Sequence, residues 1–214
     1  MDVTNFQDRR SFDEVDYQGN LNLLNEARCA SVRKFGYVSL AFAEKLLGTE
    51  YADAHENFVS VLKSSGVGYV VIRPTGFFGF HLEILKFATK GWGIMIGSGD
   101  CKTNPIHEED VAKVCVDSLG SIQGEIIVGG PDTYTRKEIT AMAFDVLKKP
   151  PRVIHIAPSV FRILVSPLRL INKRLYALMD FGVAVSQIDV MAPANGSHHI
   201  REYFEIEAKR LQTV

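Results

Sequence analysis

The sequence predicts an α/β fold with a parallel sheet, flanking helices and a small, mostly helical C-terminal lobe. Short apolar runs typical of buried strands alternate with segments whose apolar residues recur at helical spacing. The most strand-like run, residues 67–74, is stopped by Pro74, which cannot continue a central strand. The 214 residues are enough for one sizeable core, and a hydrophobic content of 46% is ordinary for a globular protein.

The elements of the first half follow from local patterns. Residues 13–30 carry apolar side chains at helical spacing and predict a helix with one buried stripe. Residues 34–42 are rich in aromatic and β-branched side chains, which favours a buried strand. Residues 49–64 return to a helical pattern, and Gly66 suits the left-handed position that ends many helices.

After Pro74 the pattern predicts a helix near residues 81–90. The four glycines of "GWGIMIGSG" are spaced like hairpin or bulge glycines. Asp110 or a neighbouring acid is expected to start a helix that runs to about Leu119. A third strand, "GEIIVGGP", follows this helix.

Thr135 and Glu138 have the spacing of a capping box and predict the start of another helix. A short strand at residues 152–158 then leads to a helical C-terminal third. We therefore expect a first unit over residues 1–150 and a small C-terminal lobe over 151–214, interleaved with the 80–106 segment.

Charge and cysteine content exclude several classes of protein. The formal net charge of −1 argues against a general nucleic-acid binder, which needs clustered Lys and Arg. Cys29, Cys101 and Cys115 lack CxxC spacing, so neither a disulfide scaffold nor a zinc knuckle is expected. The three thiols fit a reducing, cytoplasmic compartment.

Two segments bear on targeting and membranes. The polar and acidic start, "MDVTNFQDRRSFDE", does not have the apolar core of a signal peptide. The apolar stretch 157–185 is interrupted by two prolines and by four basic residues, Arg162, Arg169, Lys173 and Arg174, so it cannot cross a bilayer as one segment. Packing over a pocket is its expected role, and a membrane-surface amphipathic helix is the alternative.

Five segments carry a resemblance: "DYQGNLNLL", "KFGYVSL", "SGVGYVVIRPTGFFG", "NPIHEEDVAKV" and "IIVGGPDTYTRKEI". In this order and spacing, from about Val15 to about Phe204, they resemble the atypical short-chain dehydrogenase/reductases of the NmrA-like, NAD(P)-binding kind. The resemblance implies a Rossmann-type parallel sheet that binds NAD(P), with NADP(H) as the expected form. It also implies a smaller lobe that closes over a small-molecule substrate.

The resemblance also implies a cofactor-binding edge. Ser39 follows the strand that resembles the one beside the nicotinamide. Pro74, Thr75, Gly76 and Phe77 resemble the loop that passes the nicotinamide ring. Ligands of such sheets gather at the carboxyl ends of the strands, which agrees with both placements. The alternative is structural: a strand end and a Pro-Gly turn.

Tyr51 and His55 lie four residues apart, the spacing of the catalytic tyrosine and lysine in the superfamily that this family belongs to. Residues i and i+4 share a helix face, so the two side chains are expected to point together. A histidine is shorter than lysine and is charged only part of the time near neutral pH. The spacing therefore predicts a weakened catalytic pair, with an ordinary half-buried helix face as the alternative.

The glycine-rich GxxGxxG loop that holds the cofactor pyrophosphate in the family is not in the sequence. We therefore expect an N-terminally truncated Rossmann-like domain with a partial sheet. One edge of that sheet would be open, and an open apolar edge favours a homodimer. Weak or absent cofactor binding is the second consequence.

These features leave two functions of different kinds. The first is an NAD(P)-dependent reductase acting on a small carbonyl or conjugated substrate. The second is a non-catalytic, NAD(P)-sensing regulatory protein of the NmrA-like type, or a fragment that no longer binds dinucleotide. The histidines, including the pair His198-His199, lack metal-ligand spacing, so no metal is expected.

Overall fold

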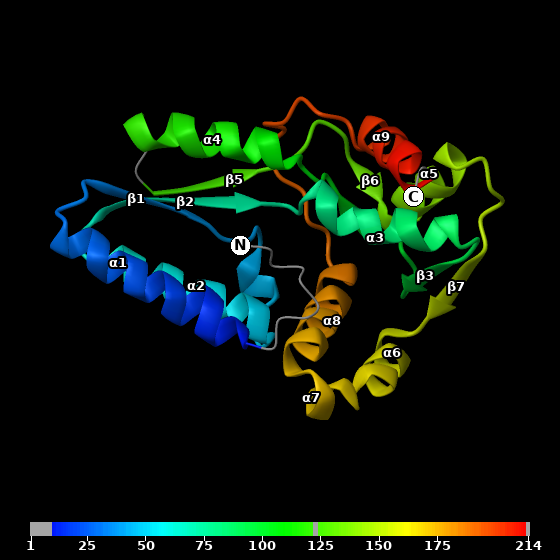
Figure 1. Cartoon of the computed structure of the whole chain (residues 1–214), viewed down its shortest axis with the longest axis horizontal. Helices are drawn as coiled ribbons and strands as arrows, with labels where there is room; N and C mark the ends of the chain where they lie inside the picture. The colour runs from blue at the N-terminus through cyan, green and yellow to red at the C-terminus, as the bar shows by residue number, and fades with distance from the viewer. Residues whose placement is uncertain (1–9, 122–123, 213–214) are drawn as a thin grey trace.

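The computed structural model describes residues 10–121 and 124–212. Its main layer is a parallel sheet of three strands in the order β1-β2-β5, namely β1 (Lys34–Val38), β2 (Gly68–Pro74) and β5 (Gly124–Val128). Helices α1 and α2 cover one face of this sheet, and α4 covers the other (Figure 1). The partial Rossmann-type sheet predicted from the sequence is therefore confirmed.

The helices on the two faces begin and end close to the predicted positions. The N-terminal helix opens with a π-helical turn, Asp13–Gln18, and continues as α1, Gly19–Cys29. Helix α2 spans Glu50–Ser64, and α4 spans Glu108–Ser121. Gly66 follows α2 with a φ of 78°, which is the left-handed conformation expected for it.

The alternation of side chains along β2 divides the first core into two halves. Val71 packs with Leu24 and Phe58 on the side of α1 and α2. Val70 and Ile72 pack on the opposite side, which α4 covers. Successive residues of a strand point to opposite faces, so a strand covered on both faces reads as one apolar run.

Strand β1 is shorter than the sequence indicates. The pattern predicted a strand over 34–42, but β1 ends at Val38, and Phe42 takes a left-handed φ of 55°. A short 3-10 helix, Ala43–Lys45, follows. The apolar residues beyond the strand are buried because they pack against α8, in a cluster that includes Leu40.

A second core lies between three helices of the other lobe. These are α3 (Phe78–Thr89), α5 (Arg136–Val146) and α9 (Ile200–Gln212). Three fully buried aromatic rings form its centre, one from each helix: Phe78, Phe144 and Phe204. Burying a phenylalanine contributes about 1.5 to 3 kcal/mol, so this core holds α9 to residues more than a hundred positions earlier.

The start of α5 confirms the predicted capping box. The Thr135 hydroxyl accepts a hydrogen bond from the backbone N–H of Glu138. The Glu138 carboxylate in turn accepts from the backbone N–H of Thr135, at 2.7 Å. Two N–H groups of the first turn that would otherwise lack partners are satisfied in this way.

The prediction of hairpin or bulge glycines in "GWGIMIGSG" is wrong. Strand β3 (Gly93–Ile96) pairs in parallel with β7 (Val153–Ile156), which lies about sixty residues further along the chain. Gly97 and Gly99 follow β3 with φ near +75°, so they form the turn after a strand. A two-residue antiparallel pair, β4 (Lys102–Thr103) with β6 (Tyr134–Thr135), completes the lobe.

Three helices fill the segment that was expected to pack over a pocket. Only α8 (Lys173–Ser186) does so in part, because its last residue, Ser186, lines an apolar cavity. Helices α6 (Pro158–Val165) and α7 (Leu168–Ile171) bury none of their residues, so the prediction is wrong for them. In the described parts of the chain, no helix has the length and apolar character needed to cross a membrane. The division near residue 150 stays a prediction.

Candidate functional site: the carboxyl edge of the sheet

The three parallel strands end at one edge, and the segments after them are tied to one another. The backbone N–H of Ser39 donates to the carbonyl of Ile72, at 2.8 Å. The N–H of Thr75 donates to the carbonyl of Val128, at 3.1 Å. This edge is therefore built from the residues that follow β1, β2 and β5, where ligands of parallel sheets gather.

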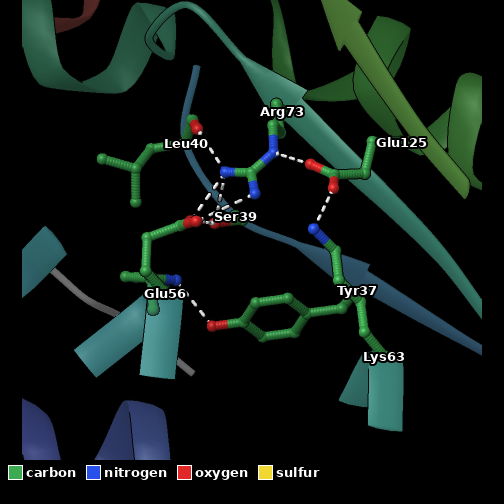
Figure 2. Close-up of polar contacts among 8 residues, drawn as sticks. Tyr37, Ser39, Leu40, Glu56, Lys63, Arg73 and Glu125 are labelled. Carbon is green, nitrogen blue, oxygen red and sulfur yellow. Dashed lines mark hydrogen bonds and ion pairs between the residues drawn. The ribbon is translucent and has the colours of Figure 1, made fainter. Parts of the chain in front are cut away.

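Arg73 occupies the centre of this edge (Figure 2). Its guanidinium donates two hydrogen bonds to Glu56, of 2.6 and 3.0 Å, and one to Glu125. It also donates to the backbone carbonyl of Leu40, at 3.0 Å. Burial alone would lower the pKa of Arg73, but its bonds to Glu56 and Glu125 raise it. The cation is thus held over the face of the sheet, between α2, the segment after β1 and the beginning of β5.

Ser39 takes part in this network. Its hydroxyl donates to Glu56 Oε1 at 3.1 Å and lies 3.4 Å from Arg73 Nη1. Lys63 adds a second cation on the far side of Glu125. Burial would raise the pKa of Glu125, but Lys63 and Arg73 hold it below its usual value. Ser39 therefore lies at the predicted edge, with its hydroxyl engaged by an ion-pair cluster.

The loop Pro74–Phe77 is fixed by the segment around Asn104. The Thr75 hydroxyl donates to the carbonyl of Asn104, at 2.6 Å, and the N–H of Ile106 donates to the carbonyl of Gly76, at 2.8 Å. Gly76 has a φ of 144°, and a Cβ atom there would meet nothing within 4 Å. The loop is held from one side and is open at Gly76.

The glycine pair after β5 allows the Asn104 segment to approach this closely. A Cβ on Gly130 would lie 1.8 Å from the carbonyl oxygen of Pro105. A Cβ on Gly129 would collide with the Asn104 side chain, which donates to the carbonyls of Gly130 and Ala192. Sequence reasoning missed this contact, although the pair "GG" directly after a strand was its signal.

Tyr51 and His55 share one face of α2, as their spacing predicts. Their ring centroids lie 4.6 Å apart in an edge-to-face arrangement. Tyr51 also packs against Phe12 and Phe181, with centroid distances of 4.9 and 4.5 Å. The tyrosine is thus packed among aromatic rings. Burial acts most on its pKa, and the charges of Asp16 and Arg174 also act on it.

The hydrogen bond of His55 goes to Tyr37. The distance from His55 Nδ1 to Tyr37 Oη is 2.6 Å, and His55 Nε2 has no hydrogen-bond partner in the described chain. Burial lowers the pKa of His55 to about 4, so the imidazole is neutral near pH 7. Burial also raises the pKa of Tyr51. A neutral His55 cannot stabilise a tyrosinate as a lysine ammonium does.

Strand β1 brings the two parts of the site together. Tyr37 and Ser39 are two residues apart on β1 and its extension, and they therefore lie on one face of the sheet. Tyr37 contacts His55, and Ser39 contacts the next residue of α2, Glu56. Among residues 10–121 and 124–212, no hydrogen bond joins the loop Pro74–Phe77 to Tyr51 or His55.

A cavity of about 170 Å³ lies beyond the loop, between α3, β3, α5 and the end of α8. Isoleucine and methionine side chains line most of it, and His81, Arg136 and Ser186 are its polar members. The Arg136 guanidinium donates to the backbone carbonyl of Cys101, at 3.2 Å. Burial, and then the charge of Arg136, lower the pKa of His81 to about 4. An apolar cavity with one cation suits a small molecule that carries an oxygen acceptor.

Three potential metal ligands meet outside this edge. His107, Glu109 and His198 place ligand atoms within 4.8 Å of one another, which their sequence spacing did not predict. The two histidines already have other neighbours. His198 lies between Asp110, at 3.1 Å, and Glu109, at 3.5 Å, and His107 Nδ1 accepts the N–H of Glu109. The absence of a metal stays a prediction.

Asp110 has a different part from the expected one. Helix α4 already begins at Glu108, and the Asp110 carboxylate accepts the backbone N–H groups of Ser197 and His198, at 3.0 and 3.1 Å. Although burial would raise its pKa, these bonds lower it. Asp110 thus ties the segment before α9 to α4.

Comparison with known proteins places the chain in a structural context. No protein-family model matches the sequence. It is 28% identical, over 180 residues, to the chloroplastic divinyl chlorophyllide a 8-vinyl-reductase of Cucumis sativus. It is 29% identical, over 106 residues, to subunit 9 of the mitochondrial NADH dehydrogenase [ubiquinone] 1 alpha subcomplex of Arabidopsis thaliana. The matches cover 78% and 45% of this chain, but 42% and 26% of those relatives.

Solved structures resemble the fold more fully. The NADPH-dependent quinone oxidoreductase of Escherichia coli in complex with NADPH superposes with a TM-score of 0.72 at 20% identity, over 87% of this chain and 69% of that one. A nucleoside-diphosphate-sugar epimerase of Staphylococcus aureus gives 0.69 at 14% identity, over 86% and 69%. At such identities the likeness establishes the Rossmann-type α/β fold.

Proposed function

We propose that this chain is the nicotinamide and substrate side of an NAD(P)-dependent reductase of the atypical short-chain dehydrogenase/reductase family, of the NmrA-like kind. The substrate would be a small carbonyl or conjugated compound. One observation carries the proposal: the loop Pro74–Phe77 at the carboxyl edge of the sheet continues into α3, whose His81 and Ile84 line an apolar cavity with one cation. Hydride transfer needs a nicotinamide site and a substrate cavity side by side.

The loop supplies the proposed nicotinamide contacts. Pro74, Thr75, Gly76 and Phe77 are held from behind by Asn104 and Ile106, and the backbone is uncovered at Gly76. Ser39 closes the same edge beside them. The E. coli relative of similar fold is described as NADPH-dependent, which supports NADP(H) as the cofactor of this chain.

The proton step is assigned to Tyr51, with His55 beside it. Because burial raises its pKa, Tyr51 keeps its proton near pH 7 and acts only as an acid. His55 is held by Tyr37 and serves to position the ring of Tyr51. Proton transfer without a lysine would be slow, so we expect modest turnover.

A second candidate function is dinucleotide sensing without turnover. The neutral, buried His55 favours it, because this residue stands where a working pair would carry a lysine charge. A fragment that no longer binds dinucleotide is the third candidate. It draws support from the sequence, which does not contain the GxxGxxG phosphate-binding loop.

We further propose a cytoplasmic homodimer. In the described part of the chain β1 pairs with β2 alone, so its outer edge has no strand partner. Such an edge can pair with another strand. Light scattering of the purified chain tests this, and a monomer at all concentrations would contradict it.

The experiment that tests the function is cofactor binding. NADPH and NADH are titrated into the purified chain and followed by calorimetry and by quenching of Trp92. A Kd below about 100 μM supports a dinucleotide site, and turnover with a panel of small quinones and enones then separates reductase from sensor. No binding at millimolar cofactor would overturn both and leave the third candidate.

A further inference from the structure

Helices α6 and α7 lie at one end of the molecule (Figure 1). Both carry large apolar side chains that are exposed. We define the α6–α7 patch by its large exposed side chains: Val160 (48% exposed), Ile163 (70%), Leu164 (63%), Leu170 (91%) and Ile171 (71%). The first three lie at i, i+3 and i+4 and so share one face of α6. Such a group of exposed aliphatic side chains is typical of a surface that another body covers.

The charge around the patch is one-sided. From Val146 to Met179 the sequence has seven Lys or Arg and no Asp or Glu, in a chain whose net charge is −1. Three of these cations are engaged within the fold. Lys149 donates to the backbone carbonyl of Thr89, Arg162 pairs with Asp180, and Arg174 is buried, with its guanidinium over the ring of Phe12. Arg169 and Lys173, which flank Leu170 and Ile171, are exposed.

We infer that the α6–α7 patch binds the surface of an anionic lipid bilayer. Aliphatic side chains would enter the boundary between headgroups and acyl chains, and Arg169 and Lys173 would meet the lipid phosphates. Pro167 separates two short helices, of eight and four residues, so this segment can lie on a bilayer but cannot cross it. The inference does not depend on the proposed reductase function.

A bilayer explains the two features together. A protein partner of ordinary composition would cover the aliphatic groups. It would not explain why the segment from Val146 to Met179 has no acidic residue. A free phosphate would use the cations and leave Leu170 in water. A second copy of the chain would bring like charges together around the patch, which disfavours self-association there.

The test is flotation of the purified chain with vesicles. We expect binding to vesicles of phosphatidylcholine with about a third phosphatidylglycerol, and weak binding to phosphatidylcholine alone. The double variant Ile163→Ser/Leu170→Ser should abolish binding. Arg169→Ser/Lys173→Ser should weaken it by about 25-fold at low salt, about fivefold for each cation.

Helix α4 offers matched controls. Val116 is 70% exposed, as Ile163 is, and Lys113 is an exposed cation on the same helix as Val116. Val116→Ser and Lys113→Ser should float like the parent chain. A fluorescent reporter, Leu170→Trp in a Trp92→Phe background, should shift its emission to the blue with anionic vesicles alone, which shows contact even if a serine variant folds poorly.

Three outcomes would overturn the inference. The parent chain fails to float with anionic vesicles at low salt, or Val116→Ser loses as much binding as the patch variant. In the third outcome, light scattering shows a dimer that the double variant Ile163→Ser/Leu170→Ser dissociates. The emission of the tryptophan reporter then does not change when vesicles are added. The patch would then be an interface between two copies.

Discussion

Tyr37 Oη lies 2.6 Å from His55 Nδ1, and this bond joins β1 to the face of α2 where Tyr51 also lies. The imidazole therefore has a structural partner before any cofactor is present. Both groups are buried, so the bond exists in a medium where an unpaired polar atom is costly.

Tyr37→Phe should destabilise the fold by about 1 to 2 kcal/mol. The change removes a hydroxyl and leaves His55 Nδ1 buried without a partner. Urea unfolding measures the free energy of unfolding. Tyr69→Phe, on the neighbouring strand β2, is the control and should change it by less than about 0.5 kcal/mol. Equal effects of the two changes would mean that the hydrogen bond contributes nothing.

Stability should fall with pH between 6.5 and about 4, and His55 should account for much of the loss. Its pKa is lower in the folded than in the unfolded chain, so the unfolded chain takes up a proton first. Stability is therefore complete above pH 6.5 and decreases as pH falls, by a total on the order of 3 kcal/mol.

His55→Gln should flatten the pH profile between 6.5 and 4, although His81 will still titrate in the same direction. Unfolding curves at several pH values give the slope for parent and variant. An unchanged slope in the variant would show that His55 has an ordinary pKa. Protonation of Asp110 and Glu125 lowers the free energy of unfolding only at lower pH, because the pKa values of these carboxyls are depressed.

Arg73→Met should cost about 2 to 3 kcal/mol of unfolding free energy. The change leaves Glu56 and Glu125 without their shared cation, and the figure lies below that of a fully buried pair because Glu125 is 32% exposed. Arg201→Met is the control, since its pair with Asp145 is largely exposed and contributes under about 1 kcal/mol. If the two variants lose similar unfolding free energy, Arg73 stabilises the fold no more than an exposed ion pair does.

Tyr51→Phe tests the proposed proton donor. If the chain reduces a quinone or enone with NADPH, kcat should fall at least about 100-fold in the variant, while the Kd for NADPH stays unchanged. Tyr69→Phe again serves as the control. If Tyr51→Phe keeps full turnover, Tyr51 is not the proton donor. The cofactor-binding result would still stand, because the Kd for NADPH is measured separately.

Zinc should not stabilise the chain. His198 already faces the Asp110 carboxylate, which is not one of the three potential metal ligands, and His107 Nδ1 accepts the N–H of Glu109. Thermal melting with and without added Zn²⁺, after chelator treatment, should therefore give the same Tm. A rise in Tm that disappears in His198→Ala would reveal a metal site.

The three-strand sheet was predictable because each strand is a local apolar run. Strands β2 and β5 also end at recognisable breakers, Pro74 and the Gly129-Gly130 pair, whereas β1 has none and its end was missed. Tyr51 and His55 were predictable as neighbours because helix geometry fixes i and i+4. Arg73 was not, because its partners Glu56 and Glu125 lie 17 and 52 residues away. No short pattern contains such a cluster, and the same holds for β3 with β7.

The exposure of α6 and α7 could not be foreseen for a different reason. An amphipathic pattern shows that one face is apolar, but it does not say whether protein, lipid or water covers that face. The proposed membrane surface therefore rests on exposed fractions that only the structure supplies, together with a charge bias that was visible in the sequence.

The pairing of β3 with β7 and the burial of Phe204 against Phe78 have a consequence for synthesis on the ribosome. The sheet β1-β2-β5 can assemble once residue 128 has emerged, whereas the core of the second lobe waits for α9. Closing contacts over such long separations is slow. Until then α3 presents Phe78 and Leu85 to its surroundings, so the nascent chain would need a chaperone most during translation of its last third.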